Sequence, residues 1–159
     1  MKKEWDRRTR QCDYTQLRPE LRVAIEKELK EMEEELDILF CIETESILLK
    51  KSGLFNNRRK VQHVAAIVTP TWLVQAVEAS EYNTEIIALF HYLDKMQITF
   101  ETMEMAKAIG IEDYGIDVLS QTRWNLRGGR HFIGLEYNAI SQQFIEALKD
   151  AIKAVKARP

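Results

Sequence analysis

The first residues that could do chemistry form a basic cluster in a segment predicted to be a loop between two strands. Five cations fall within eleven residues, with no acid among them: Lys50, Lys51, Arg58, Arg59 and Lys60. Converging ammonium and guanidinium groups can bind phosphate oxygens, and arginine adds bidentate geometry. The competing interpretation is a solvated hairpin tip whose charges keep a sheet edge from pairing. We weight that interpretation more heavily, because charge clusters on loops are common.

A second basic cluster combines arginines with an aromatic ring. It occupies residues 123–131 and contains Arg123, Trp124, Arg127, Arg130 and His131. Arginine beside an aromatic ring can stack on bases or pair with anions. The pair Gly128-Gly129 in the same segment is also typical of a hairpin turn, and we prefer this structural interpretation. The functional interpretation would be favoured if both basic clusters lay at the same end of the fold.

Catalytic and metal-binding motifs are not evident. His63, His91 and His131 lie singly on strand-like runs, without the spacing of a metal site. The sequence has no phosphate-binding glycine loop, nucleophile elbow or zinc-protease motif. Cys12 and Cys41 form no disulfide framework, and Cys41 is interpreted as a small hydrophobic core residue. We therefore predict no enzyme activity, no metal and no cofactor.

Composition limits the classes of partner. The chain has 159 residues, of which 45% are hydrophobic and 30% charged, and its formal net charge is -2. This composition is that of an ordinary soluble domain. Because the net charge is slightly negative, the protein has no overall positive potential that would attract nucleic acid, and we rank nucleic acid last among partners. The first twenty residues contain no signal-peptide core, and no apolar run approaches the ~20 residues of a membrane span. We expect a cytoplasmic protein.

Two amphipathic helices are predicted to frame the elements that carry these residues. The C-terminal helix has Asn138 as its N-cap and an apolar stripe at helical spacing, made by Ile140, Phe144, Ala147, Leu148, Ala151 and Val155. The other helix spans Pro19 to Leu36, with proline in the first turn. The basic leader before it, residues 1–18, shows no periodicity and is predicted to be loosely held, although Trp5 and Tyr14 could pin it to the body.

Between the helices the pattern is almost wholly β. About seven short apolar or β-branched runs recur at roughly 8–12-residue spacing, at residues 38–50, 61–68, 72–77, 85–92, 96–101, 114–121 and 130–137. The connection 102–112 is ambiguous. We predict a mainly β (α+β) fold: an antiparallel barrel or bent sandwich closed by the C-terminal helix. We predict that the chain has two parts. Residues 1–36 contain the leader and the added helix, and residues 37–159 form the barrel with its C-terminal helix.

This order of elements resembles the bacterial pleckstrin-homology-like (PH-like, GRAM-like) domains. The likeness is carried by Val64 to Val74, by Ile87 to Ile98 and by the helical Phe144 to Leu148. The resemblance implies that the first interstrand loop binds phosphorylated headgroups, at positions matching Lys50, Lys51, Arg58 and Lys60. Two departures are the added helix and Phe144, which stands in place of the tryptophan of eukaryotic members.

The first functional hypothesis is a non-catalytic PH-like binding or assembly module. Its partner would be another protein, a second copy of the chain or an anionic, phosphate-bearing membrane surface. The alternative is a small-ligand-binding barrel or enzyme with a pocket at one barrel end, whose polar contacts would be Tyr92, Tyr114, Tyr137 or His131. A deep pocket with converging polar groups favours the alternative, and a barrel filled by side chains excludes it.

Overall fold

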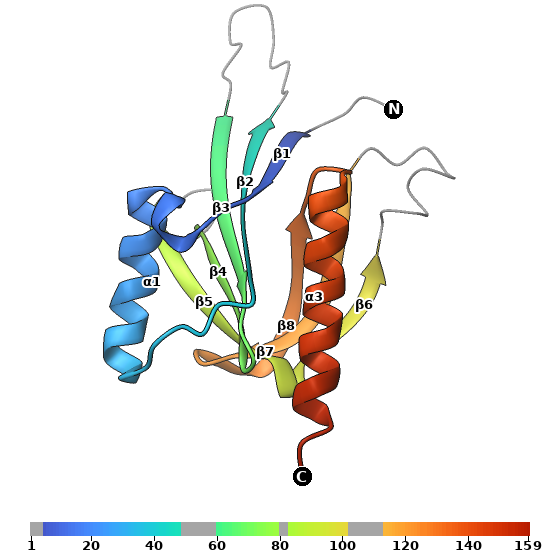
Figure 1. Ribbon diagram of the computed structural model, residues 1–159. Helices are drawn as coiled ribbons and strands as arrows, with labels where there is room; N and C mark the ends of the chain where they lie inside the picture. Colours follow the sequence, from blue (N-terminus) through green and yellow to red (C-terminus); the bar gives the residue numbers. More distant parts are fainter. Residues whose placement is uncertain (1–4, 49–59, 80–82, 102–112) are drawn as a thin grey trace, which may run out of the picture.

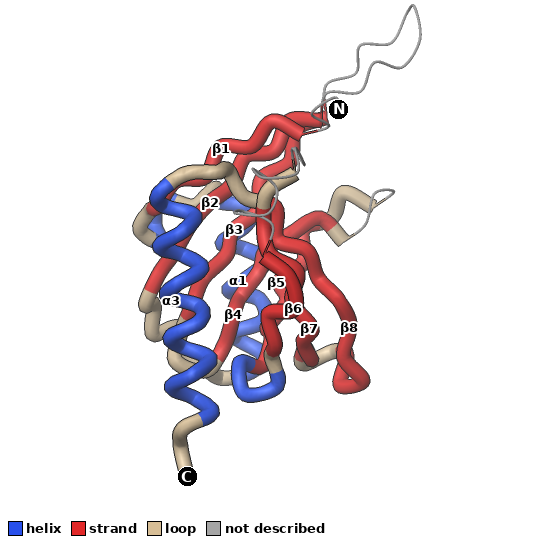
Figure 2. The backbone as a smooth tube through the Cα atoms, turned by 90° about the vertical axis from the view of Figure 1, so that its right-hand side faces the viewer, coloured by secondary structure: helices blue, strands red, loops and turns tan. Residues whose placement is uncertain are grey.

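The computed structural model describes residues 5–48, 60–79, 83–101 and 113–159. Eight antiparallel strands form one curled sheet in the order β1-β2-β3-β4-β5-β7-β6, with β8 beside β7. Figures 1 and 2 show that this sheet is a half-barrel rather than a flat layer. The strands are β1 (Trp5–Gln11), β2 (Phe40–Leu48), β3 (Lys60–Val68), β4 (Trp72–Glu78), β5 (Ile86–Tyr92), β6 (Gln97–Glu101), β7 (Gly115–Thr122) and β8 (Asn125–Gly134).

The two faces of the sheet are covered by different helices. Successive strand residues point to opposite faces, so Cys41 and Ile42 enter different cores. The helix α1 (Pro19–Met32) packs on the convex face against β4 and β5. The helix α3 (Ala139–Lys156) lies on the concave side, as Figure 1 shows. No helix in the described part of the chain combines the length and apolar character needed to cross a membrane.

The C-terminal helix forms as its sequence predicts. The backbone amide of Ser141 donates to Asn138 Oδ1 at 2.8 Å, so Asn138 is the N-cap. Phe144 and Leu148 are fully buried in the concave core. The apolar stripe thus stabilises the helix by burial, whereas its other face stays in solvent.

Side chains join β1 to the segment between β8 and α3. The amide of Thr9 donates to Glu136 Oε2 at 3.0 Å, and the amide of Glu136 donates to Thr9 Oγ1 at 3.0 Å. Asn138 Nδ2 also donates to the carbonyl of Thr9, at 3.1 Å. These bonds satisfy backbone groups of β1 that face away from β2. We call this contact the seam.

The N-terminal segment differs from the prediction of a loosely held leader. Residues 5–11 form β1, which pairs with β2 from Trp5 opposite Leu48 to Gln11 opposite Ile42. The hydroxyls of Thr9 and Thr44 bond across this pair at 2.9 Å. The sheet therefore has eight described strands rather than seven.

Three element boundaries also need correction. The helix α1 ends at Met32, not at residue 36, because Glu33 takes a left-handed conformation with φ 53°. The strand β2 begins at Phe40 rather than at residue 38, and its pairing with β3 is continuous to Leu48. The hairpin after β7 turns at residues 123–124, so Gly128 lies inside β8. Its positive φ of 85° falls opposite a register shift beside Ser120, which a glycine accommodates without strain.

The coarse fold prediction is confirmed: the protein is mainly β, an antiparallel barrel-like sheet with a C-terminal amphipathic helix and an added N-terminal helix. The segment 102–112, whose sequence is ambiguous, lies outside the described residues.

Candidate ligand cavity

The half-barrel encloses an open cavity of about 630 Å³ on its concave face. The core around α3 fills only part of this face, using residues such as Ile42, Val68 and Leu73. The other ends of the same strands, including Leu48, Lys60 and Val77, line the cavity instead. Its volume lies within the range of ~300–1,000 Å³ that is usual for small-molecule sites.

The cavity wall mixes apolar, hydrogen-bonding and charged side chains. The apolar part consists of Leu48, Val64, Val77 and Leu89, with the rings of Trp5 and Phe132. The uncharged polar part consists of Ser46, Gln62, Gln75 and His131. Such a wall can bury a hydrocarbon or aromatic body while fixing the orientation of a polar group.

A buried hydrogen-bond chain supports Gln75 from behind. His91 is fully buried, with Nδ1 2.7 Å from Ser120 Oγ and Nε2 3.0 Å from Gln75 Oε1. Burial, with a smaller contribution from the neighbouring His131, lowers the pKa of His91 to about 3. The neutral ring therefore accepts from Ser120 and donates to Gln75. Gln75 therefore accepts through Oε1, which leaves its amide nitrogen as the remaining donor of a side chain that lines the cavity.

The contact between Ser120 and His91 looks like the nucleophile and base of a hydrolase. Ser120 is only 1% exposed, however, so a substrate carbonyl has no access to its hydroxyl. A histidine whose pKa is about 3 is also a poor base at neutral pH. We assign this pair a structural role.

Arg7 supplies a partly buried positive charge at the cavity wall. Its guanidinium lies 5.2 Å from the ring centroid of Trp5 and 5.9 Å from that of Phe132, and it pairs with Asp113. A Cβ atom at Gly134 would overlap this guanidinium, so a larger residue there would displace the Arg7 side chain. Burial lowers the pKa of Arg7 to about 10, which still leaves it charged at neutral pH.

The charges of the cavity are unequal. Among the lining residues that the structure describes, the cations are Arg7, Lys60 and Arg130, and the carboxylate is Glu78. Lys60 Nζ lies 3.5 Å from Glu78 Oε2, and Arg130 Nε lies 3.5 Å from Asp117. Burial lowers the pKa of His131, although Asp117 opposes this shift. Each of the three cations thus faces one carboxylate, but Asp113 and Asp117 lie outside the lining. The lining itself therefore carries more cations than carboxylates, which favours an anionic group on a ligand.

The predicted basic loop is represented in the described residues by Lys60 alone. Lys50, Lys51, Arg58 and Arg59 lie outside them, so the predicted headgroup site stays a prediction.

The second basic cluster is divided between two places. Arg123 Nη1 lies 3.2 Å from Glu28 Oε2 on α1, and Trp124 Nε1 donates to the same carboxylate oxygen at 3.2 Å. Arg127 is exposed on β8, whereas Arg130 borders the cavity. The segment thus does not form one loop that could bind a single anion.

Of the four polar residues proposed for a pocket, only His131 lines the cavity. Tyr92 packs on Trp72 in the convex-face core, with ring centroids 4.5 Å apart. Tyr114 and Tyr137 stack on each other at 5.0 Å and line a different pocket of about 370 Å³. Sequence reasoning missed Arg7, Gln62 and Gln75. The one local signal was a glutamine inside each of two β-rich segments, Gln62 in β3 and Gln75 in β4.

No protein-family model, curated protein or solved structure matches the chain. The class of protein is therefore given by fold and cavity alone: an antiparallel half-barrel with an open, mixed-polarity cavity. Within the described residues, no group of three or more histidine, cysteine or acidic side chains could hold a metal ion.

Proposed function

We propose that this protein binds a small molecule in the cavity of its half-barrel. The observation that carries this proposal is the cavity itself, about 630 Å³ in volume and lined by both apolar and polar side chains. A barrel whose interior was filled by side chains would not support it.

The ligand is an amphipathic anion. Half-buried apolar side chains such as Val64 and Leu89 suit a hydrocarbon or aromatic body. Arg7 and Lys60 suit a carboxylate or a similar anionic group, and Gln75 adds a donor held in place by His91. Arginine beside a site that is partly screened from water gives stronger charge-assisted hydrogen bonds than an exposed one.

The experiment uses two substitutions in β3 whose side chains lie on opposite faces of the sheet. Val64 lines the cavity, whereas Val61 is 44% exposed and belongs to the opposite face. Binding is followed by the fluorescence of anilinonaphthalene sulfonate, which carries aromatic rings and one anionic group. We expect saturable binding to wild type and to Val61→Phe, and binding weaker by about tenfold or more for Val64→Phe, because the added ring occupies the cavity.

Competition then tests the ligand class. Decanoate should displace the probe at lower concentration than decanol, since only decanoate carries the anionic group. Circular dichroism checks that both variants are folded. Absence of saturable binding to wild type, or equal binding by wild type and Val64→Phe, would contradict the proposal.

The resemblance to pleckstrin-homology-like domains remains a prediction, as does an anionic surface or protein partner. The order of strands and the C-terminal helix are compatible with that class. The loop that would carry its headgroup site lies mainly outside the described residues. We rank this function second, because the cavity supports the other one directly.

A further inference from the structure

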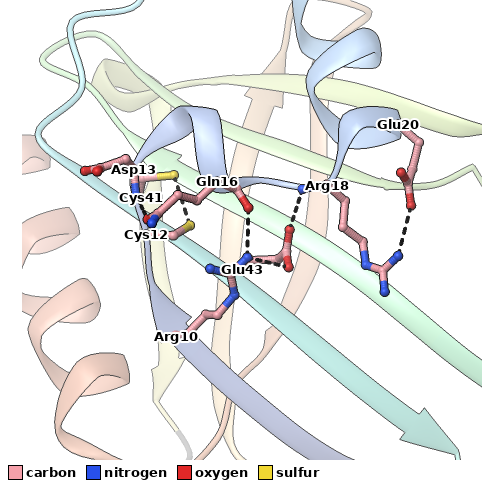
Figure 3. Close-up of polar contacts among 8 residues, drawn as sticks. All are labelled: Arg10, Cys12, Asp13, Gln16, Arg18, Glu20, Cys41 and Glu43. Atoms are coloured by element: carbon pink, nitrogen blue, oxygen red, sulfur yellow. Dashed lines mark hydrogen bonds and ion pairs between the residues drawn. The ribbon is translucent and has the colours of Figure 1, made fainter.

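The two cysteines of the chain lie together on the convex face. Cys12 follows the last residue of β1, and Cys41 belongs to β2, one position beyond the pair Gln11 and Ile42. The amide of Cys12 donates to the carbonyl of Cys41 at 3.1 Å, so the strand pairing continues through them. Their Sγ atoms are 3.9 Å apart, and the two side chains face each other in Figure 3.

We propose that Cys12 and Cys41 are a redox site, which a peroxide converts to an intramolecular disulfide. This inference concerns the face opposite the cavity and is independent of the proposed function. It differs from the sequence-based interpretation of Cys41 as a core residue only, because the sequence does not reveal that Cys12 lies opposite it.

Strand pairing holds the two thiols in suitable positions. Directly opposed residues of antiparallel strands have Cα atoms about 4.5–5.5 Å apart. Disulfides span Cα separations of about 4.4–6.8 Å. The pairing thus places the two thiols within the span of a disulfide, and rotation of the side chains would bring the sulfurs into bonding distance.

The surroundings make the two thiols unequal. The hydrogen bond from Cys41 lowers the pKa of Cys12, and the positive charge of Arg10 lowers it further, against the effects of burial and of Glu43 and Asp13. The same hydrogen bond and burial raise the pKa of Cys41. Cys12 is also the more accessible, with 8% of its surface exposed against 3% for Cys41. Cys12 is the nucleophile, and Cys41 is the resolving thiol.

The reaction balances in two steps. The thiolate of Cys12 attacks one oxygen of hydrogen peroxide, the O–O bond breaks, and the released hydroxide takes a proton to leave as water. The sulfur of Cys41 then attacks the resulting sulfenic acid and expels its hydroxyl, which leaves as a second water with the proton of Cys41. Two thiols are oxidised to one disulfide, and the peroxide is reduced.

The disulfide would reinforce a junction that already carries a polar clamp. Arg10 Nη2 lies 2.9 Å from the carbonyl oxygen of Gln16 and 3.0 Å from Glu43 Oε2. Glu43 Oε1 accepts from the amide of Arg18 at 2.9 Å, directly before α1. Figure 3 shows these contacts around the cysteines. A bond between Cys12 and Cys41 thus fixes the base of the segment that leads into the helix.

The test begins with reduced wild-type protein exposed to hydrogen peroxide at neutral pH. Free thiols are counted under denaturing conditions, and peptide mass spectrometry locates any cross-link. We expect loss of both thiols, a mass lower by two hydrogen atoms and a peptide that joins Cys12 to Cys41. Dithiothreitol should restore both thiols.

Variants separate the two roles. Cys41→Ser should stop at a sulfenic acid on position 12, which dimedone traps, whereas Cys12→Ser should give far less dimedone adduct. Arg10→Gln should slow thiol loss severalfold, with a part of the rate restored in Arg10→Lys. Retention of both thiols by wild type after peroxide treatment would overturn the proposal, as would cross-links only between separate chains.

Discussion

His91 illustrates how a single residue ties the cavity wall to the interior. Its ring is fully buried between Gln75 and Ser120, and its edge packs on His131 with centroids 4.7 Å apart. A buried polar group is tolerable only when its hydrogen bonds are made. Both nitrogens are engaged here, so the ring serves to orient the Gln75 amide.

The pKa of His91 predicts a dependence of stability on pH. The folded protein holds this pKa at about 3, whereas an exposed histidine in the unfolded chain titrates near ~6.5. Below ~6.5 the unfolded chain binds a proton that the folded protein does not. The free energy of unfolding therefore falls with falling pH, by up to ~1.4 kcal/mol per unit, until the pH approaches the folded pKa.

Urea unfolding of wild type and His91→Gln at pH 6.5, 5.5 and 4.5 measures this effect. The variant removes the titrating group, so its stability should fall less over the same interval. The free energy of unfolding of wild type minus that of the variant should therefore decrease each time the pH is lowered. A difference that stays constant with pH would show that His91 is not held neutral.

At the scale of elements, the start of α3 serves two purposes. Asn138 caps the helix through Oδ1, and its Nδ2 donates to the carbonyl of Thr9 in β1. The same amide nitrogen lies 2.7 Å from Glu136 Oε2. The residue that begins the helix thereby also contributes to the seam.

Two substitutions at this position separate the cap from the seam. Asn138→Ser keeps a capping oxygen but loses the amide donor, whereas Asn138→Ala loses both. We expect Ala to be less stable than Ser by ~1 kcal/mol, and Ser to be less stable than wild type by about 1 kcal/mol. Chemical denaturation measures both differences. Equal stability of the two variants would mean that the cap contributes nothing.

At the scale of the molecule, the sheet separates two cores that depend on different helices. The concave core relies on α3, where Phe144 packs with its ring centroid 6.4 Å from that of Phe40. The convex core relies on α1, through Leu21 and Ile25. Neither helix contributes to both cores, so each face of the sheet is stabilised separately.

Truncation of Phe144 tests this dependence. Phe144→Ala should lower the free energy of unfolding by ~3–5 kcal/mol, because it leaves a cavity in a fully buried site. Val23→Ala on α1 is the control, since Val23 is 64% exposed and its change should be within about 0.5 kcal/mol. A loss below ~1 kcal/mol for Phe144→Ala would contradict the assignment of α3 to the core.

The sequence predicts the elements better than it predicts the site. The stripe from Ile140 to Val155 and the cap at Asn138 have local periodicity, so they are visible without tertiary information. The strand β1 cannot be recognised from sequence in this way. It is an edge strand with Arg7, Arg8 and Arg10, and it lacks the apolar alternation by which strands are recognised.

The cavity depends on information that no local pattern contains. Gln62 and Gln75 lie on neighbouring strands and become cavity neighbours only through the strand register. The same holds for Cys12 and Cys41, which are 29 positions apart and meet through the pairing of β1 with β2. The β character of each segment is local, whereas the face that a residue occupies is fixed by long-range pairing.

The seam has a consequence for the order of folding. Its bonds join Thr9 to residues 127 and 129 positions later, so they close almost the whole chain into a loop. Contacts of such long sequence separation cost the most chain entropy and are expected to form late. The pairing of β2 with β3 and the packing of α1 involve shorter separations. We therefore expect the convex core to be established first, and the ligand cavity to be completed only when the two ends of the chain meet.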